Sequence, residues 1–220
     1  MIPLYDADRR PVNFPVMTLT LIVINFIVFG FELALGEDFV TRWSLVPAHI
    51  TAGQDWITLL TSMFLHEGWE HILGNMVFFW AFGPEVEDAM GPVRYLVFYL
   101  IGGLVANFAQ IAVDPTSTIP SLGASGAIAA VMGAFILAFP GDRIKCVLII
   151  FVFVRVTVIP AVVLLGFWFL SQVFSQIGSI ADVQNGGVAY MAHIGGFIYG
   201  ALAWRLFEST EGRKKRLTLE

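Results

Sequence analysis

Residues 16–35 read VMTLTLIVINFIVFGFELAL, an apolar run that contains a single carboxylate, Glu32. A helix rises about 1.5 Å per residue, so a run of this length reaches about 30 Å, the thickness of the hydrocarbon core of a bilayer. The rest of the chain has the same character: 57% of its 220 residues are hydrophobic and 13% are charged, whereas about 25% are charged in ordinary soluble domains. The sequence therefore predicts an all-α polytopic membrane protein.

This composition excludes several other classes of protein. The apolar fraction is too high for a disordered chain, a coiled coil or a soluble domain. The only cysteine, Cys146, cannot form an internal disulfide, which excludes a secreted disulfide scaffold. The net charge of −5 gives no signal for binding nucleic acid. Residues 1–15 are polar, and we do not expect them to be a cleavable signal peptide.

Five further apolar segments follow the first, and we predict that all six cross the membrane as a helical bundle. The long stretch 36–68 mixes aromatic with polar residues, which is typical of a structured interfacial loop. The stretch 146–159 is apolar, but Arg155 interrupts it and Pro160 ends it, so we interpret it as an interfacial or hairpin-like connection. The predicted spans are 16–35, 69–82, 94–113, 125–140, 161–178 and 187–207.

The placement of basic residues predicts which way the chain crosses the membrane. With six spans, all of the 12 Lys and Arg residues except Arg42 fall on one side. By the positive-inside rule, that side is the cytoplasm, and both termini lie there. We therefore expect a cytoplasmic segment 1–15, a membrane domain 16–207 and a basic cytoplasmic tail 208–220, in a plasma membrane of prokaryotic type.

Ser125 and His193 lie inside predicted spans, where polar residues are functional candidates. The span 125–140 reaches only about 24 Å, so Ser125 lies below the outer surface if Pro140 lies at the cytoplasmic boundary. His193 lies roughly 9 Å below the outer end of the last span, at a similar depth. Taken alone, Ser125 is more typical of a helix N-cap, and His193 of a buried hydrogen-bonding residue or a metal ligand. No cysteine cluster or second deep histidine supports a metal site.

Small residues continue the faces of both helices. They recur at helical spacing after Ser125 and after His193, and small residues let two membrane helices approach closely. This packing predicts that the serine and the histidine come within hydrogen-bonding distance, as a Ser nucleophile and its base require. The small residues are Ala129 and Gly133 on the first face, and Gly196 and Gly200 on the second.

His71 and Asn75 form a third candidate pair, at the outer start of the second span. They are four residues apart and share one face of a helix. Both side chains can donate hydrogen bonds, and acyl-transfer enzymes need donors for the oxyanion of a tetrahedral intermediate. The alternative is an interfacial histidine and an asparagine that packs helices together. His49 and His66 lie in the outer loop and carry less weight.

These motifs resemble those of the rhomboid family of intramembrane serine proteases. The matching pieces are GASG at 123–126, the His71-x-x-x-Asn75 pair, and AHIGG at 192–196 with the glycine that follows. The resemblance covers about residues 16–207. It implies that Ser125 is the nucleophile and His193 its base, and that His71, Asn75 and the backbone N–H of Ser125 form an oxyanion hole.

The resemblance also implies the partners of the reaction. The substrates would be single-span or polytopic membrane proteins, cut near the outer face at a small residue in a locally unwound helix. No cofactor, metal or nucleic acid is implied. Two alternatives remain at this point, namely a catalytically silent relative that binds membrane proteins and a small transporter. A silent relative typically lacks the Ser or the His, and a transporter would be expected to show internal repeats.

The sequence departs from the family pattern at two positions. Ile57 stands where many members have an Arg, and Ala129 stands where an aromatic residue often stacks on the base. Something other than residue 129 must therefore orient His193. Glu87 matches a family glutamate, for which we expect a structural role. We also predict a dyad without an acidic third member, because every outer Asp and Glu lies in or beside a loop.

Overall fold

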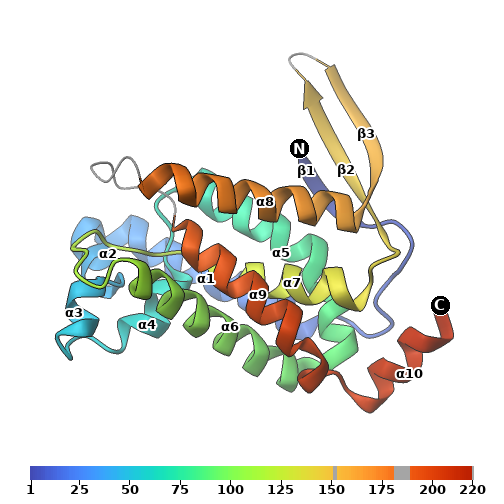
Figure 1. Cartoon of the computed structure of the whole chain (residues 1–220), viewed down its shortest axis with the longest axis horizontal. Helices are drawn as coiled ribbons and strands as arrows, with labels where there is room; N and C mark the ends of the chain where they lie inside the picture. Colours follow the sequence, from blue (N-terminus) through green and yellow to red (C-terminus); the bar gives the residue numbers. More distant parts are fainter. Residues whose placement is uncertain (151–152, 181–188, 220) are drawn as a thin grey trace.

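The computed structural model describes residues 1–150, 153–180 and 189–219. Long helices that run roughly side by side make up most of the molecule (Figure 1). The short helices of the first loop lie at one end of this bundle, and a small β-sheet and the C-terminal helix lie at the other. The long helices are α1 (Val16–Leu35), α5 (Trp69–Met90), α6 (Pro92–Val113), α7 (Ser125–Ala138), α8 (Ala161–Ile180) and α9 (Tyr190–Phe207).

Among the residues that the structure describes, three helices are long and apolar enough to cross a membrane. They are α1, α6 and residues Ala161–Gly178 of α8, and α7 is a shorter apolar helix. Helices α5 and α9 begin at or near the residues where two further spans were predicted to begin. The structure does not confirm that the number of membrane spans is six. The chain is thus a mainly helical protein with three candidate membrane spans.

Helix α5 is longer than the apolar run that predicted it. We expected the span to end near Phe82, but the helix continues through an acidic stretch to Met90. Glu87 is buried there and accepts hydrogen bonds from the backbone N–H groups of Met17 and Thr18, at 2.8 and 2.7 Å. These N–H groups belong to the first turn of α1 and have no partner within their own helix. Glu87 therefore ties α5 to α1, which is a structural role.

Helix α7 lies at the centre of the bundle, and almost all of its side chains are buried. It packs closely on α9 because glycines face the neighbouring backbone. A Cβ added at Gly133 would overlap the carbonyl oxygen of Phe197, and one added at Gly200 would overlap that of Ala130. Such close contact between backbones is possible only where side chains are absent.

The first loop contains short helices that pack on one end of the bundle (Figure 1). They are α2 (Glu37–Trp43), α3 (Pro47–Thr51), α4 (Thr58–Thr61) and the 3-10 turn η1 (Ser62–Phe64). Leu45, Ile50 and Leu59 form a small core with Ile111 of α6. The loop therefore has a buried face of its own.

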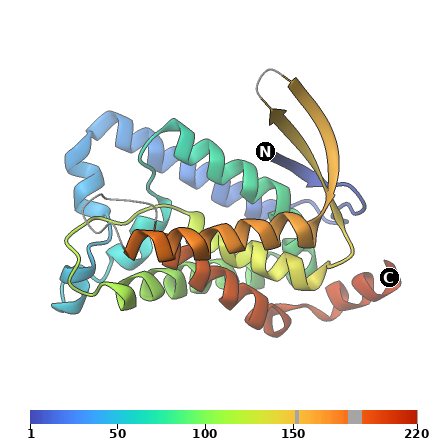
Figure 2. The same ribbon diagram turned by 45° about the horizontal axis from the view of Figure 1, so that its top comes forward.

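The sheet consists of three antiparallel strands in the order β1-β2-β3. Strands β2 (Arg143–Ile150) and β3 (Phe153–Pro160) form a hairpin, so the hairpin interpretation of the stretch before Pro160 is correct. The far part of the β2–β3 hairpin stands away from the helices in both views (Figures 1 and 2), whereas Ile144 and Cys146 of β2 belong to the main core. Strand β1 (Ile2–Asp6) was not predicted, and it pairs with β2 across more than a hundred residues of sequence. The basic tail contains α10 (Thr210–Leu219).

Candidate active site

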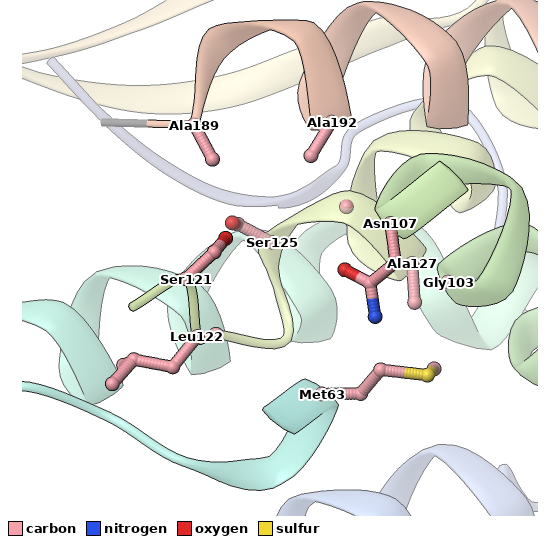
Figure 3. Close-up of a pocket in the computed structure, with 11 residues that line it drawn as sticks. Met63, Gly103, Asn107, Ser121, Leu122, Ser125, Ala127, Ala189 and Ala192 are labelled. Carbon is pink, nitrogen blue, oxygen red and sulfur yellow. The ribbon is translucent and has the colours of Figure 1, made fainter. Parts of the chain in front are cut away.

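Ser125 is the first residue of α7, and a tight turn before it is held by the first loop. Gly123 has φ of +127°, a conformation that favours glycine, and its N–H donates to the carbonyl of Ser62 at 2.9 Å. Ser121 exchanges two backbone hydrogen bonds with Leu45, at 3.0 and 2.7 Å. Figure 3 shows Ser125 beside Ser121, facing the start of α9, where Ala189 precedes the helix and Ala192 lies in its first turn.

His193 is the fourth residue of α9 and is 8% exposed. Its Nε2 lies 2.7 Å from Ser125 Oγ. The close packing of the two helices accounts for this distance, because a Cβ added at Gly196, one turn along α9, would overlap the carbonyl oxygen of Gly126. The structure thus brings together the serine and histidine that the sequence singled out.

Two residues of α8 contact the other side of the imidazole, and sequence reasoning missed both. Gln172 Oε1 lies 2.8 Å from His193 Nδ1. The ring of Trp168 lies 5.7 Å from the imidazole, centroid to centroid, at an interplanar angle of 39°. Two signals in the sequence could have found them. Gln172 is a polar residue inside a predicted span, and Ala129 stands where the family resemblance leads us to expect an aromatic neighbour of His193.

His71 faces the turn before Ser125. Its Nε2 lies 3.0 Å from the point where a Cβ of Gly123 would be. Its Nδ1 accepts a long hydrogen bond of 3.4 Å from the backbone N–H of Glu67. In the neutral ring, the proton is then on Nε2, which can donate toward the site. This orientation is compatible with the oxyanion role that the family resemblance implies for His71.

Asn75 lies one turn further along α5 and is 9% exposed. Its Nδ2 has no hydrogen-bond partner among the residues that the structure describes. A buried donor without a partner is costly, and an incoming oxyanion would supply the missing acceptor. The structure does not place Asn75 in contact with Ser125.

His66, to which the sequence gave little weight, packs its ring against that of His71. The two ring centroids are 5.1 Å apart at 70°, and His66 is 1% exposed. Burial and the neighbouring His71 lower the pKa of His66 to about 4, so its ring is neutral at physiological pH. Its backbone N–H donates to both carboxylate oxygens of Glu32, at 3.1 Å each. His66 thus anchors the end of the first loop against α1.

A small cavity of about 10 Å³ lies next to the serine (Figure 3). This is room for about one water molecule. Its lining includes Met63, Gly103, Asn107 and Ala127.

In the described ranges, no three His, Cys, Asp or Glu side chains gather in a way that could hold a metal ion. The partner of His193 Nδ1 is an amide and not a carboxylate. Asp182, one of the outer acidic residues considered in the sequence, lies outside the described residues. Ile57 lies in the first loop, far in sequence from Ser125 and His193, and its side chain is 55% exposed.

Comparison with known proteins agrees with the motifs. A sequence model of the Rhomboid domain matches residues 53–209. Rhomboid protein 1, mitochondrial, of Saccharomyces cerevisiae is 27% identical over 91% of this chain and 56% of its own length. Rhomboid protease GluP of Bacillus subtilis is 29% identical over 86% of this chain and 34% of its own. Putative rhomboid protease YdcA, also of Bacillus subtilis, is 30% identical over 56% of this chain and 62% of its own length. The chain thus spans about a third to three fifths of the length of these relatives.

Proposed function

The chain belongs to the rhomboid family of membrane proteins, and we propose that it is an intramembrane serine endopeptidase. The observation that carries this proposal is the 2.7 Å contact between Ser125 Oγ and His193 Nε2. The family includes serine intramembrane proteases such as GluP. A serine hydroxyl gains nucleophilic strength when an adjacent base can take its proton.

The reaction follows from the roles of these two side chains. Ser125 Oγ attacks the carbonyl carbon of the scissile peptide while its proton passes to His193 Nε2. The tetrahedral intermediate then collapses, the C–N bond breaks, and the imidazolium gives the proton to the leaving amine. A water molecule, deprotonated by His193, attacks the acyl-enzyme and releases the new carboxyl end with Ser125 restored.

The negative charge of the intermediate requires donors that are already in place. His71 Nε2, Asn75 Nδ2 and the backbone N–H of Ser125 supply them. The last of these is one of the first N–H groups of α7, which have no partner inside the helix. In a site shielded from water, such donors contribute much of the rate acceleration.

We propose the topology of six spans with both termini in the cytoplasm, and the division into 1–15, 16–207 and 208–220. The charge distribution supports it, because Arg42 is the one basic residue on the side opposite the termini. One relative is a mitochondrial protein of yeast and another comes from Bacillus subtilis. We propose that this chain lies in a prokaryotic plasma membrane, as the bacterial relative would. The substrates are membrane proteins whose helix unwinds near the outer face, with a small residue at the cut that suits the small cavity.

The alternative is a silent family member that binds membrane proteins without cutting them. Purified protein in liposomes, incubated with a single-span reporter substrate, distinguishes the two. We expect cleavage by the wild type, none by Ser125→Ala or His193→Ala, and a fluorophosphonate label that mass mapping assigns to Ser125. Ser121, in the same cavity, serves as an internal control and should stay unlabelled. Cleavage by folded Ser125→Ala at the wild-type rate would contradict the proposal.

A further inference from the structure

We propose that Gln172 of α8 is the positioning residue of the base, holding His193 in the tautomer that carries its proton on Nδ1. In a Ser-His-Asp triad a carboxylate has this role. Here the contact at Nδ1 comes from a neutral amide at 2.8 Å. The kinetic part of this inference rests on the proposed protease function, whereas the tautomer is a property of the resting protein.

The orientation of the amide follows from its other hydrogen bonds. Gln172 Nε2 lies 3.0 Å from Ser171 Oγ and 3.4 Å from the carbonyl oxygen of Trp168. The Ser171 hydroxyl donates its own proton to that carbonyl at 2.6 Å, so Oγ is left as an acceptor for the amide. A turned amide would place its oxygen against the carbonyl oxygen of Trp168, where two acceptors repel. Oε1 is therefore the atom that faces His193.

The tautomer of the imidazole follows from this orientation. An amide oxygen only accepts hydrogen bonds, so His193 Nδ1 must donate to it. A neutral imidazole has one proton on its ring nitrogens, and Nε2 is then free to accept from Ser125 Oγ. With the proton on Nε2 instead, the ring would donate toward Ser125 and could not act as its base.

The depth of the site explains why an amide is found there. A carboxylate inside the membrane is expensive unless it is paired, and a neutral amide avoids that cost. The amide orients the imidazole without adding a permanent charge. Trp168 lies one turn before Gln172 on α8, and its ring lies near the imidazole. Ala129 has only a methyl group and cannot stack on the imidazole as an aromatic side chain would. The base is thus oriented by a helix other than its own.

Nitrogen-15 NMR of histidine-labelled protein in nanodiscs tests the tautomer without any substrate. The four histidines are distinguished by comparison with His193→Asn. We expect His193 to show a protonated Nδ1 and an unprotonated Nε2 near pH 7.5, and this signature to be lost in Gln172→Leu. The matched control is Gln110→Leu, because Gln110 Oε1 accepts from the backbone N–H of Ala192, beside His193, whereas the ring nitrogens of His193 lie against Gln172 and Ser125.

Kinetics with the single-span reporter test the consequence. We expect Gln172→Leu to lower kcat by about 10- to 100-fold with little change in KM, since an imidazole in the wrong orientation loses part of the contribution of general base catalysis. Gln172→Glu should retain most activity at high pH. The acid limb of the pH–rate profile of Gln172→Glu should lie about one pH unit higher than that of the wild type, because a carboxylate beside the ring stabilises the imidazolium. Gln110→Leu should match the wild type.

Two results would overturn the positioning role. The first is a folded Gln172→Leu that keeps the His193 nitrogen signature and the wild-type kcat. The second, which serves if Gln172→Leu does not fold, is a Gln172→Glu whose pH profile coincides with that of the wild type. If the wild type cuts no substrate but the signature is present and depends on Gln172, the protease proposal fails and the positioning inference stands.

Discussion

Replacing Gly196 by alanine should misplace the base with a single methyl group. The added Cβ would overlap the carbonyl oxygen of Gly126, next to the nucleophile, far inside ordinary van der Waals contact. Cβ atoms in proteins essentially never come within 3.0 Å of a non-bonded heavy atom from another part of the chain, so α9 must move away from α7 by about 1 Å. His193 lies one turn away on the same helix and moves with it. A displacement of about 1 Å in a catalytic group can lower the rate about 100-fold.

The assay is cleavage of the reporter substrate in liposomes, with folding checked by thermal denaturation of each purified variant. Gly166→Ala in α8 is the matched control, because a Cβ there has nothing within 4 Å. We expect Gly196→Ala to lose about 100-fold in kcat and to label slowly with fluorophosphonate, while Gly166→Ala behaves as the wild type. A folded Gly196→Ala that cleaves at the wild-type rate would refute the close-packing argument.

Three further predictions test the oxyanion hole, the topology and the N-terminal strand. Asn75→Ala should lower kcat by about 10- to 1000-fold, less than loss of the nucleophile, because other donors remain; an unchanged kcat would remove Asn75 from the site. In a Cys146→Ala background, cysteines at 54 and 118 should react with an impermeant reagent outside intact cells and those at 10 and 214 should not, and the reverse pattern would overturn the six-span topology. Burial and the neighbouring Asp142 raise the pKa of Asp6 to about 7. Asp6 therefore takes up a proton when the protein folds near neutral pH. The docking of β1 should be strongest near pH 4 and should weaken as the pH rises through 7. Hydrogen exchange of Ile2–Asp6, corrected for the intrinsic rate, should show this dependence, and Asp6→Asn should abolish it.

The sequence predicted the helices well where the physical requirement is local. An apolar run long enough to cross a bilayer is visible in the residues themselves. The end of α5 was missed because hydropathy treats Glu87 as an exposed residue. Its carboxylate is in fact buried, since it accepts hydrogen bonds from the free N–H groups at the start of α1. Strand β1 was missed because its partner strand, β2, lies more than a hundred residues later in the sequence, so no local pattern shows the pairing.

The pairing of the serine and histidine could be predicted because it depends on residue type, depth and small-residue faces. The orientation of the histidine could not, since it depends on which face of α8 packs against α9. Nothing in the local sequence distinguishes Gln172 from Gln176, one turn later. Only the packing shows that Gln172 is the one in contact with His193 Nδ1.

The first loop has a physical task that follows from where Ser125 lies. In the proposed topology, the chain before α7 enters the outer part of the membrane without helical hydrogen bonds, and backbone polar groups there must find partners in the protein. Ser121 obtains them from Leu45, and Gly123 from Ser62. Both partners belong to the first loop, and Leu45 is itself held in the small core with Ile111. The loop therefore supplies the hydrogen bonds that keep the nucleophile's turn at depth, and its short helices are the framework that presents those groups.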